Sequence, residues 1–214
     1  MNETSRRGLG WAPGHEGRGV GAVVERSDAA RNRIKIVEAA RVSFEEHGVT
    51  RVTMEDVARA AGVGKGTLYR RFPNKGLLCQ ALLDEPTRRV QEDAMRLVAA
   101  PGVAPLTKLG EFLERIVEFT EENLDLLYGG NEPLCGADRM ARFAHPAYDW
   151  RRWTILGLLR AADKEGDLEE GLDLEYIAAA ILAPLDVDFY YYQRRVQGIP
   201  QDRISAGLRS LAPS

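Results

Sequence analysis

Six residues between Lys65 and Lys75 carry side chains that bring positive charge or a hydroxyl group: Lys65, Thr67, Tyr69, Arg70, Arg71 and Lys75. Ammonium and guanidinium groups pair with phosphate oxygens, and a guanidinium can also donate two hydrogen bonds to the O6 and N7 atoms of guanine. Thr and Tyr hydroxyls donate to phosphate oxygens as well. This set predicts a nucleic-acid surface, provided that the local fold turns these side chains outward.

A short helix is predicted immediately before this stretch. Thr53 is a good N-cap, and Asp56, three residues later, can return the capping hydrogen bond. Val52 and Val57 flank the cap at the spacing of a hydrophobic staple, which fixes the direction from which the chain enters the helix. Gly62 then ends this helix and permits a tight turn.

The polar residues themselves are predicted to lie on a second short helix, with Gly64 at its N-cap position. This helix must end before Pro73, because the residue that precedes a proline avoids the α conformation. Leu68 and Phe72 face inward in this arrangement, so the polar side of the helix faces outward. A projecting second helix of this kind can enter the major groove of DNA, and Asn74 caps the helix that follows.

The run GVGKGT at residues 62–67 superficially suggests a phosphate-binding loop. That motif requires Ser or Thr directly after the lysine, and here Gly66 follows Lys65. The three histidines lie outside any metal-ligand spacing, and there is no GxSxG sequence. We therefore expect no catalytic residues, no metal site and no cofactor.

The segment from Ala39 to Leu78 resembles the DNA-binding domain of the TetR family of bacterial one-component regulators. The matching pieces are, in order, Phe44-x-x-x-Gly48, Val52-Thr53-x-x-x-Val57-Ala58, Ala61-Gly62-Val63 and Gly66-Thr67-Leu68-Tyr69-x-x-Phe72-Pro73-Asn74-Lys75. The resemblance implies a helix-turn-helix in which the second helix reads DNA. The residues expected to contact DNA are Thr53, Gly64, Lys65, Gly66, Thr67, Tyr69, Arg70, Arg71 and Lys75.

The resemblance also implies particular roles. The first residues of the second helix would face base edges or adjacent phosphates, and Tyr69 would offer its hydroxyl to a phosphate or its ring to a thymine methyl group. Lys75 would meet the DNA backbone. Three positions depart from the family pattern: Gly64 stands where serine is common, and Arg70 and Arg71 stand where an aromatic pair or a Tyr-His step is common. These arginines would either read guanine or contact phosphate alone.

Residues 1–26 contain six glycines and four arginines without periodicity, and we expect a disordered basic arm. It would either contact DNA phosphates or have no function. The first ordered helix is predicted to begin at the N-cap Ser27 and to end at Gly48. Residues 27–75 then form the DNA-binding domain.

Residues 76–214 are predicted to form a helical bundle for effector binding and dimerisation. The expected breaks lie at Pro86, at 101–105 and in the irregular stretch 128–145, where a short helix over 137–143 is possible. Further helices are expected from Pro146, and from Asp173 through a kink at Pro184 to Arg195. A last helix follows Pro200, which gives an all-α fold with about nine helices in total.

Aromatic residues of the bundle could line an effector pocket, although aromatics at helical spacing are more often plain core. The candidates are Phe112, Phe119, Tyr128, Phe143, Trp150, Trp153 and Tyr176. In the TetR family the last two long helices of each subunit pair with those of its mate. The candidates for that surface, with intramolecular core as the alternative, are Ile181, Leu185, Phe189, Ile204 and Leu208.

The charge of the chain is unevenly distributed. The net charge is −3, but residues 28–75 hold ten Lys or Arg against six Asp or Glu. The later part is acidic, so only one end of the molecule suits phosphate. Cys79 and Cys135 are expected to be free thiols, and the chain lacks an apolar run long enough to span a membrane, so we expect a cytoplasmic protein without membrane partners.

These patterns predict a homodimeric, sequence-specific DNA-binding regulator of transcription, and a repressor that a small molecule releases from its double-stranded DNA operator. One alternative is a regulator of the same shape that acts without a ligand or as an activator. Another is an all-α binding bundle or enzyme with an incidental basic end. The sequence names neither the effector nor the operator.

Overall fold

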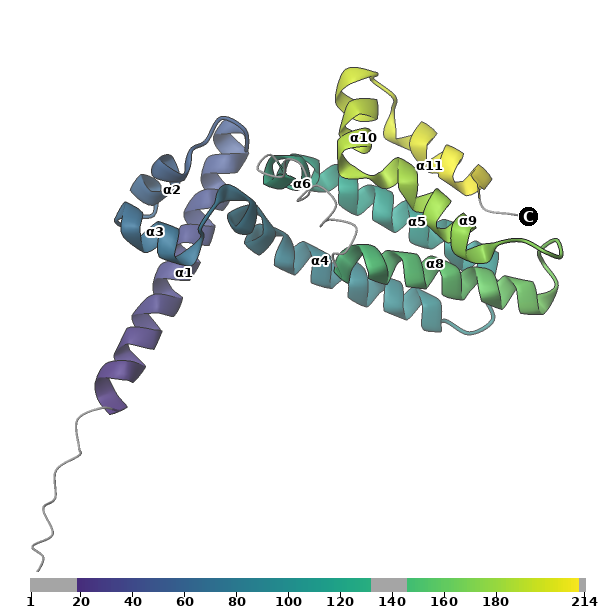
Figure 1. Ribbon diagram of the computed structural model, residues 1–214, viewed down its shortest axis with the longest axis horizontal. Helices are drawn as coiled ribbons and strands as arrows, with labels where there is room; N and C mark the ends of the chain where they lie inside the picture. The colour runs from purple at the N-terminus through teal and green to yellow at the C-terminus, as the bar shows by residue number, and fades with distance from the viewer. Residues whose placement is uncertain (1–18, 132–145, 212–214) are drawn as a thin grey trace, which may run out of the picture.

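The computed structural model describes residues 19–131 and 146–211. Regular structure in these ranges is entirely helical, with ten α-helices and short 3₁₀ and π turns. Helices α1 to α3 form a head at one end of the molecule, and α4 leads from the head into a body that contains the remaining helices (Figure 1). The predicted all-α architecture with an N-terminal helix-turn-helix and a C-terminal bundle is confirmed.

Helix α1 (Gly19–His47) begins eight residues before the predicted cap. The prediction of a start at Ser27 is wrong, because residues 19–26 contain no proline to stop the helix, which continues back through them. Its C-terminal end is as predicted, since Gly48 has a φ of 81° and ends the helix in the left-handed conformation. The buried face consists of Ile36, Ala40 and Phe44, at i, i+4 and i+8.

Helices α2 (Met54–Ala60) and α3 (Lys65–Arg71) form the helix-turn-helix. Between them Gly62 has a φ of 65°, and the Val63 amide donates to the Ala58 carbonyl at 3.0 Å. Gly62 allows the turn to close with this hydrogen bond, because glycine adopts the left-handed conformation without steric cost. Ala58 is only 3% exposed, as expected for a small residue where two helices approach closely. The predicted boundaries of both helices are confirmed.

Helix α4 (Lys75–Ala99) runs without interruption from the head into the body. Its predicted cap is present, because the Asn74 side chain accepts a hydrogen bond from the Leu77 amide. The predicted break at Pro86 is wrong, since the proline lies inside the helix. A proline there removes one backbone hydrogen bond. Salt bridges that span this position, from Arg88 and Arg89 to Glu85, support the helix across the gap.

The segment between the predicted breaks at 101–105 and 128–145 forms two helices. Helix α5 (Pro105–Glu122) ends at Asn123, and α6 (Leu124–Asn131) follows directly. The Asn123 side-chain amide donates to the Phe119 carbonyl at 2.8 Å. A side chain that bonds the backbone in this way competes with the helical pattern and explains the break.

The C-terminal part contains α8 (Pro146–Glu165), α9 (Leu174–Leu182), the 3₁₀ turn η2 (Ala183–Leu185), α10 (Val187–Tyr191), the π turn η3 (Tyr192–Val196) and α11 (Gln201–Leu211). The starts of α8 at Pro146 and of α9 after Asp173 are as predicted. The single kinked helix expected over Pro184 is wrong. Asp186 has extended backbone angles (φ −56°, ψ 131°), and its side chain caps α10, so the chain makes a full break.

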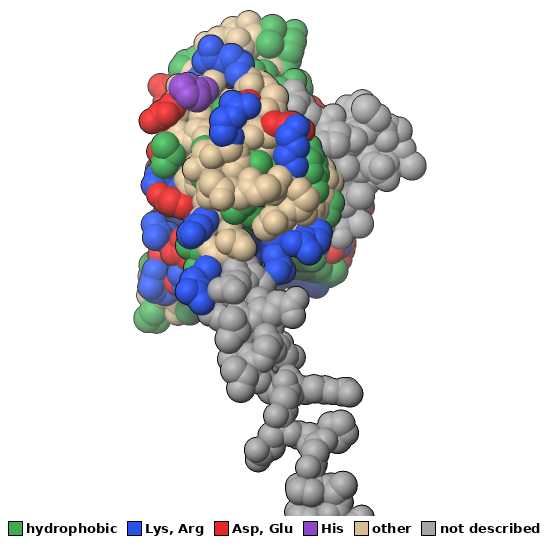
Figure 2. Space-filling model, turned by 90° about the vertical axis from the view of Figure 1, so that its left-hand side faces the viewer, with side chains coloured by type: hydrophobic (Ala, Val, Ile, Leu, Met, Phe, Trp, Pro, Cys, Tyr) green, Lys and Arg blue, Asp and Glu red, His purple; other side chains and the backbone are tan. Residues whose placement is uncertain are grey.

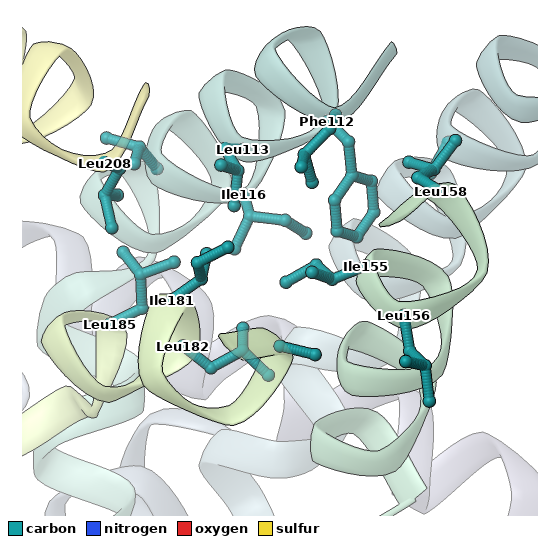
Figure 3. Packing of buried hydrophobic residues seen from close by; sticks show 14 of the residues in the cluster. Phe112, Leu113, Ile116, Ile155, Leu156, Leu158, Ile181, Leu182, Leu185 and Leu208 are labelled. Carbon is teal, nitrogen blue, oxygen red and sulfur yellow. The ribbon is translucent and has the colours of Figure 1, made fainter. Parts of the chain in front are cut away.

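The core of the body lies where α5, α8, α9 and α11 meet. Figure 3 shows Phe112, Leu113 and Ile116 of α5 close to Ile155 of α8 and Ile181 of α9. A second cluster fills the head and includes Leu78 and Cys79 from the start of α4. The start of α4 is thus part of the head core, which fixes its direction relative to α1–α3.

Candidate nucleic-acid interface and internal cavity

Helix α3 buries its apolar side and exposes its polar side. Leu68 is fully buried and Phe72 is 3% exposed, so both fix the helix against the head core. The exposed side chains of the helix are those of Lys65, Tyr69, Arg70 and Arg71, while Thr67 is half-buried. The outward polar face predicted from the sequence is confirmed, whereas its contacts with DNA remain a prediction.

The two arginines at the end of α3 have no acidic partner among the described residues. Lysine and arginine side chains lie around the face of the molecule that the head presents in Figure 2, with acidic groups among them. Arg59 on α2 is paired with Asp56 at 3.2 Å. Arg70 and Arg71 are therefore free to bind an anion without first breaking an ion pair.

Helix α2 is held at its start by a complete capping box. The Asp56 amide donates to Thr53 Oγ1 at 3.2 Å, and the Thr53 amide donates to Asp56 Oδ2 at 3.1 Å. Hydrogen bonds from the Thr53 hydroxyl and amide hold the pKa of the Asp56 carboxyl below its usual value. Both predicted partners are in place, and Thr53 itself is exposed at the surface of the head.

Glu55 is a residue of this face that the sequence did not suggest. Its Oε1 atom lies 3.4 Å from Lys65 Nζ and also accepts the Tyr69 hydroxyl at 3.4 Å. Its own backbone amide and Lys65 lower the pKa of the Glu55 carboxyl. Two predicted DNA contacts are thus held by one carboxylate across the helix-turn-helix. Such a pairing depends on how the two helices cross, which no spacing in the sequence encodes.

Lys75 is placed differently from the other predicted contacts. It is half-buried, its Nζ donates to the Thr50 carbonyl at 3.4 Å, and it lies 6.0 Å from the centre of the Phe44 ring. The lysine therefore connects the start of α4 to the end of α1 and to the loop before α2. Any DNA contact by Lys75 comes from this tethered position.

A cavity of about 690 Å³, partly open to solvent, lies beside the head, between α4, α5, α6, α8 and the α9–α10 region. Most of its lining is apolar. Of the seven aromatic residues predicted for a pocket, only Phe119 is among the lining residues that the structure describes. Lining residues that the sequence did not suggest include Leu83, Leu126, Tyr148, Arg151, Leu182 and Val187.

The other predicted pocket residues lie elsewhere. Phe112 packs edge-on against Trp150 in the core, with ring centres 5.6 Å apart, and Tyr128 stacks on Tyr191 at 3.7 Å. Trp153 is 54% and Tyr176 is 72% exposed, and neither is among the residues that line the cavity. Phe143 lies outside the described residues, as do Cys135 and the possible helix over 137–143. Aromatic spacing alone does not distinguish core, surface and cavity.

Among the side chains that the structure describes, those of residues 30–130 and 146–211, Arg151 carries the one buried polar atom that lacks a hydrogen bond. This atom, Nε, is inaccessible, although part of the residue stays accessible where it lines the cavity. The guanidinium carbon lies 5.5 Å from the centre of the Phe119 ring. Burial without an acidic partner lowers the pKa of Arg151 to about 10. The group therefore still carries its charge at neutral pH.

Four of the five residues predicted for a subunit interface are buried within the single chain. The exposed fractions are 1% for Ile181, 5% for Leu185, 6% for Ile204 and 2% for Leu208. They belong to the body core, so their prediction as a surface is wrong and the alternative of intramolecular core holds. Phe189 is 49% exposed and remains available to a partner.

Head and body touch through closely packed glycines at the end of α6. A Cβ atom added at Gly129 would lie 2.5 Å from Val49 Cγ1, and one added at Gly76 would lie 2.7 Å from the Gly130 carbonyl oxygen. Real side chains do not approach so closely, so glycine is required at this junction unless its neighbours move. Movement of α6 is thereby coupled sterically to the start of α4 and to the head.

Comparison with known proteins bears on the whole chain. Residues 36–82 match the family model of bacterial regulatory proteins, tetR family. The "Probable HTH-type transcriptional regulator ArpR" of Pseudomonas putida is 46% identical over 181 residues, which cover 75% of this chain and 80% of that protein. The chain belongs to the TetR family. It is a DNA-binding regulator of transcription, in agreement with the helix-turn-helix of its head.

A more distant relative and a solved structure are also similar to the chain. The HTH-type transcriptional regulator TtgR of Pseudomonas putida is 28% identical over 181 residues, with the same shares of both chains covered. The structure of the FadR repressor of Thermus thermophilus, in complex with lauroyl-CoA, is 22% identical and has the same fold, with a TM-score of 0.62. That match covers 84% of this chain and 92% of FadR. No helix in the described ranges is long and apolar enough to cross a membrane.

Proposed function

We propose that this TetR-family regulator is a homodimeric repressor that a small molecule releases from its operator. The observation that carries the proposal is the pairing of two features along α4. The head has an exposed helix whose arginines have no acidic partner among the described residues, and a cavity of about 690 Å³ lies beside the head, along the first part of α4. The volume lies within the usual range for sites of small ligands. A regulator of this kind carries out no chemistry and acts where the DNA is, in the cytoplasm.

Helix α3 is proposed to enter the major groove. Its first residues, Gly64 to Thr67, would approach base edges or phosphates, and Thr53 would contact the backbone beside them. Arg70 and Arg71 would add phosphate contacts or read guanine. The distances of 3.4 Å from the Glu55 carboxylate to Lys65 and Tyr69 indicate weak interactions. Lys65 and Tyr69 would therefore leave Glu55 when the closely spaced phosphates of DNA come within reach.

Residues 27–75, together with the first turns of α1 from Gly19, are proposed as the DNA-binding domain, and residues 76–214 as the ligand-binding and dimerisation domain. A second copy of the chain is needed because one recognition helix reads only a few base pairs. Two-fold pairing would place two heads about 34–36 Å apart on one face of the DNA. Exposed apolar residues near the C-terminal end offer surface for this partner: Tyr176, Phe189, Tyr192 and Val196.

The proposed response to the ligand runs through α4 and α6. Both helices line the cavity, through Leu83 and Leu126 among others. A ligand that fits one arrangement of these helices better than another shifts the population toward it. The glycine contacts with Val49 and Gly76 would transmit that shift to the head. Two heads with a changed spacing no longer fit successive major grooves.

Fluorescence anisotropy with the DNA upstream of the protein's own gene tests the operator proposal. Affinity should fall by orders of magnitude between about 50 mM and about 200 mM salt, because binding releases counterions from DNA. Replacing Arg71 by alanine should reduce affinity by about 10- to 100-fold and make the salt dependence less steep. The matched control is Arg160→Ala in the body, where the arginine pairs with Glu175. A flat salt response would overturn the proposal.

A further inference from the structure

Among the residues that the structure describes, the buried cation of the cavity, Arg151, has no anionic partner. Two carboxylates belong to lining residues, and both are engaged elsewhere. Asp84 lies 3.7 Å from Arg33 of the head, and Asp186 accepts hydrogen bonds from the Asp188 and Phe189 amides at 3.2 and 3.4 Å. Neither is paired with Arg151.

The second cation of the lining is already neutralised. Arg88 pairs with Glu85 and Glu92, each at 2.6 Å, and these glutamates lie on the exposed side of α4. Arg151, by contrast, has no ion pair or hydrogen bond with the described residues. Its guanidinium carbon lies over the face of the Phe119 ring. A cation–aromatic contact satisfies no N–H donor, so it leaves the buried Nε donor of this guanidinium without a hydrogen bond.

An uncompensated guanidinium in an apolar site destabilises the folded chain. Taking a charge out of water is costly unless an opposite charge and hydrogen bonds replace the lost hydration. Arginine does not escape the cost by losing its proton at neutral pH, because its pKa stays far above that value even when lowered. A bound anion would remove this cost, so the free energy of binding would include relief of the unpaired charge.

We propose that the cavity binds an amphipathic organic anion, whose oxyanion group pairs with Arg151 while its apolar part lies against the side chains around it. This inference rests on the proposed ligand-responsive function and specifies its ligand class. The apolar wall comes from several helices and includes Leu83, Phe119, Leu126, Leu127, Leu182 and Val187. The planar guanidinium suits the two oxygens of a carboxylate, which it can bind through parallel hydrogen bonds.

The test uses two fluorescent probes with the same ring system. Anilinonaphthalene sulfonate carries an anion, and phenylnaphthylamine is its uncharged counterpart. Both should bind the full-length protein. Arg151→Met keeps much of the side-chain volume but removes the charge, and it should weaken binding of the sulfonate by about 10- to 100-fold while leaving the uncharged probe unchanged. Arg151→Lys should restore part of the affinity for the sulfonate.

Displacement of phenylnaphthylamine by decanoate and by decanol identifies the oxyanion. Decanoate should compete better than decanol in the natural protein, and Arg151→Met should abolish the difference. A preference for the sulfonate without a preference for decanoate would restrict the class to stronger acids and overturn the carboxylate assignment. Equal loss of both probes in Arg151→Met, or no loss of either, would overturn the role of Arg151.

A separate measurement distinguishes this inference from the function on which it rests. If neither probe binds the natural protein although it binds its operator, the ligand cavity itself is refuted. If both probes bind and release DNA regardless of the charge at position 151, the ligand-responsive function stands and only the anion assignment fails. Without ligand, Arg151→Met should also raise the melting temperature, because it removes an unpaired buried charge. An unchanged or lower melting temperature contradicts the unpaired state.

Discussion

Polar contacts within the head and within the body of this regulator differ in how far apart in the sequence their partners lie. In the head the capping hydrogen bonds at the starts of α2 and α4 join near neighbours in sequence, Thr53 with Asp56 and Asn74 with Leu77. In the body Glu121 of α5 binds Tyr190 and Arg194, which follow it by 69 and 73 residues. The helix starts of the head are therefore specified locally, whereas this network of the body depends on the packing of distant segments.

The same comparison extends to function. The unpaired arginines of the head, Arg70 and Arg71, are exposed and remain hydrated until a polyanion arrives, so they cost little stability. The unpaired arginine of the body, Arg151, is withdrawn from water at its Nε atom. The arginines of the head thus stay hydrated until an anion binds, whereas the Nε atom of Arg151 in the body has lost its water and has not gained a hydrogen bond in its place.

The largest effect is expected where the long-range network of the body is broken. Arg194 donates to both carboxylate oxygens of Glu121, at 2.6 and 2.8 Å, and each side chain is 19% exposed. Replacing Glu121 by glutamine should lower the free energy of unfolding by about 2 kcal/mol, because charged hydrogen bonds are lost in a mostly buried setting. Urea denaturation measures it. The control Glu114→Gln, at the more exposed pair with Arg209, should cost less than about 1 kcal/mol.

The same carboxylate should make the stability of the body depend on pH. The hydrogen bonds from Arg194 lower the pKa of Glu121 in the folded chain. A lowered pKa means that the contribution is fully present above the ordinary glutamate value of about 4.3 and is lost as pH falls through the folded value. Urea midpoints measured on acidification should fall less steeply in Glu121→Gln than in the natural protein. Parallel curves would show that other acids dominate.

The next largest effect is expected from substitutions at the junction between head and body. Alanine at Gly129 places a Cβ atom 2.5 Å from Val49 Cγ1, and overpacking of this kind costs about 1–3 kcal/mol. The Gly129→Ala variant should therefore be less stable and bind DNA less well, because the head is displaced. Adding Val49→Ala removes the clashing methyl group and should recover part of both losses. Additive losses in the double variant would mean that the two residues do not communicate.

The contrast in range also explains which features the sequence could predict. The starts of α2, α4, α8 and α9 were predicted because a cap or a proline marks each of them within a few residues. Pro86 and Pro184 carry the same kind of signal, yet one lies inside a continuous helix and the other at a full break. Whether such a proline interrupts its helix depends on the residues that pack around it.

Some residues of the candidate site could be predicted from the sequence, and others could not. The outward face of α3 follows from its short apolar pattern, in which Leu68 and Phe72 are the buried residues. Glu55 and Arg151 were missed because their importance comes from what lies near them in space. For Arg151 a faint signal existed, since Ala147, Tyr148 and Arg151 recur at helical spacing and all line the cavity. Spacing cannot show that none of the described acidic residues pairs with that arginine.

A smaller effect is expected from the local contacts of the head. Thr53→Ala removes the N-cap of α2 and should destabilise this helix by about 1 kcal/mol. Hydrogen exchange of the α2 amides measures this locally, because partial unfolding can be confined to one unit of the structure. The control is Thr154→Ala in α8, where the hydroxyl donates to the Trp150 carbonyl within the helix and caps no free amide. Faster exchange throughout the body would contradict the local specification of the head.

The smallest effect concerns the cap that α3 lacks. Gly64 has the extended backbone angles of an N-cap, φ −69° and ψ 148°, but offers no side-chain hydrogen bond. A Cβ atom at this position meets nothing within 4 Å, so Gly64→Ser introduces a hydroxyl without a clash. The gain should be a few tenths of a kcal/mol, roughly the difference measured between glycine and serine caps.

The matched control is Gly64→Ala, which has the same backbone restriction but no hydroxyl. Slower exchange of the α3 amides in the serine variant alone would attribute the gain to capping. Equal slowing in both variants would attribute it to the lower entropy of the unfolded chain, because alanine also restricts that chain relative to glycine. Operator affinity gives the second reading, since a serine hydroxyl at the start of α3 can reach a phosphate. If stability rises while affinity falls, the bare glycine serves close approach of the backbone to DNA.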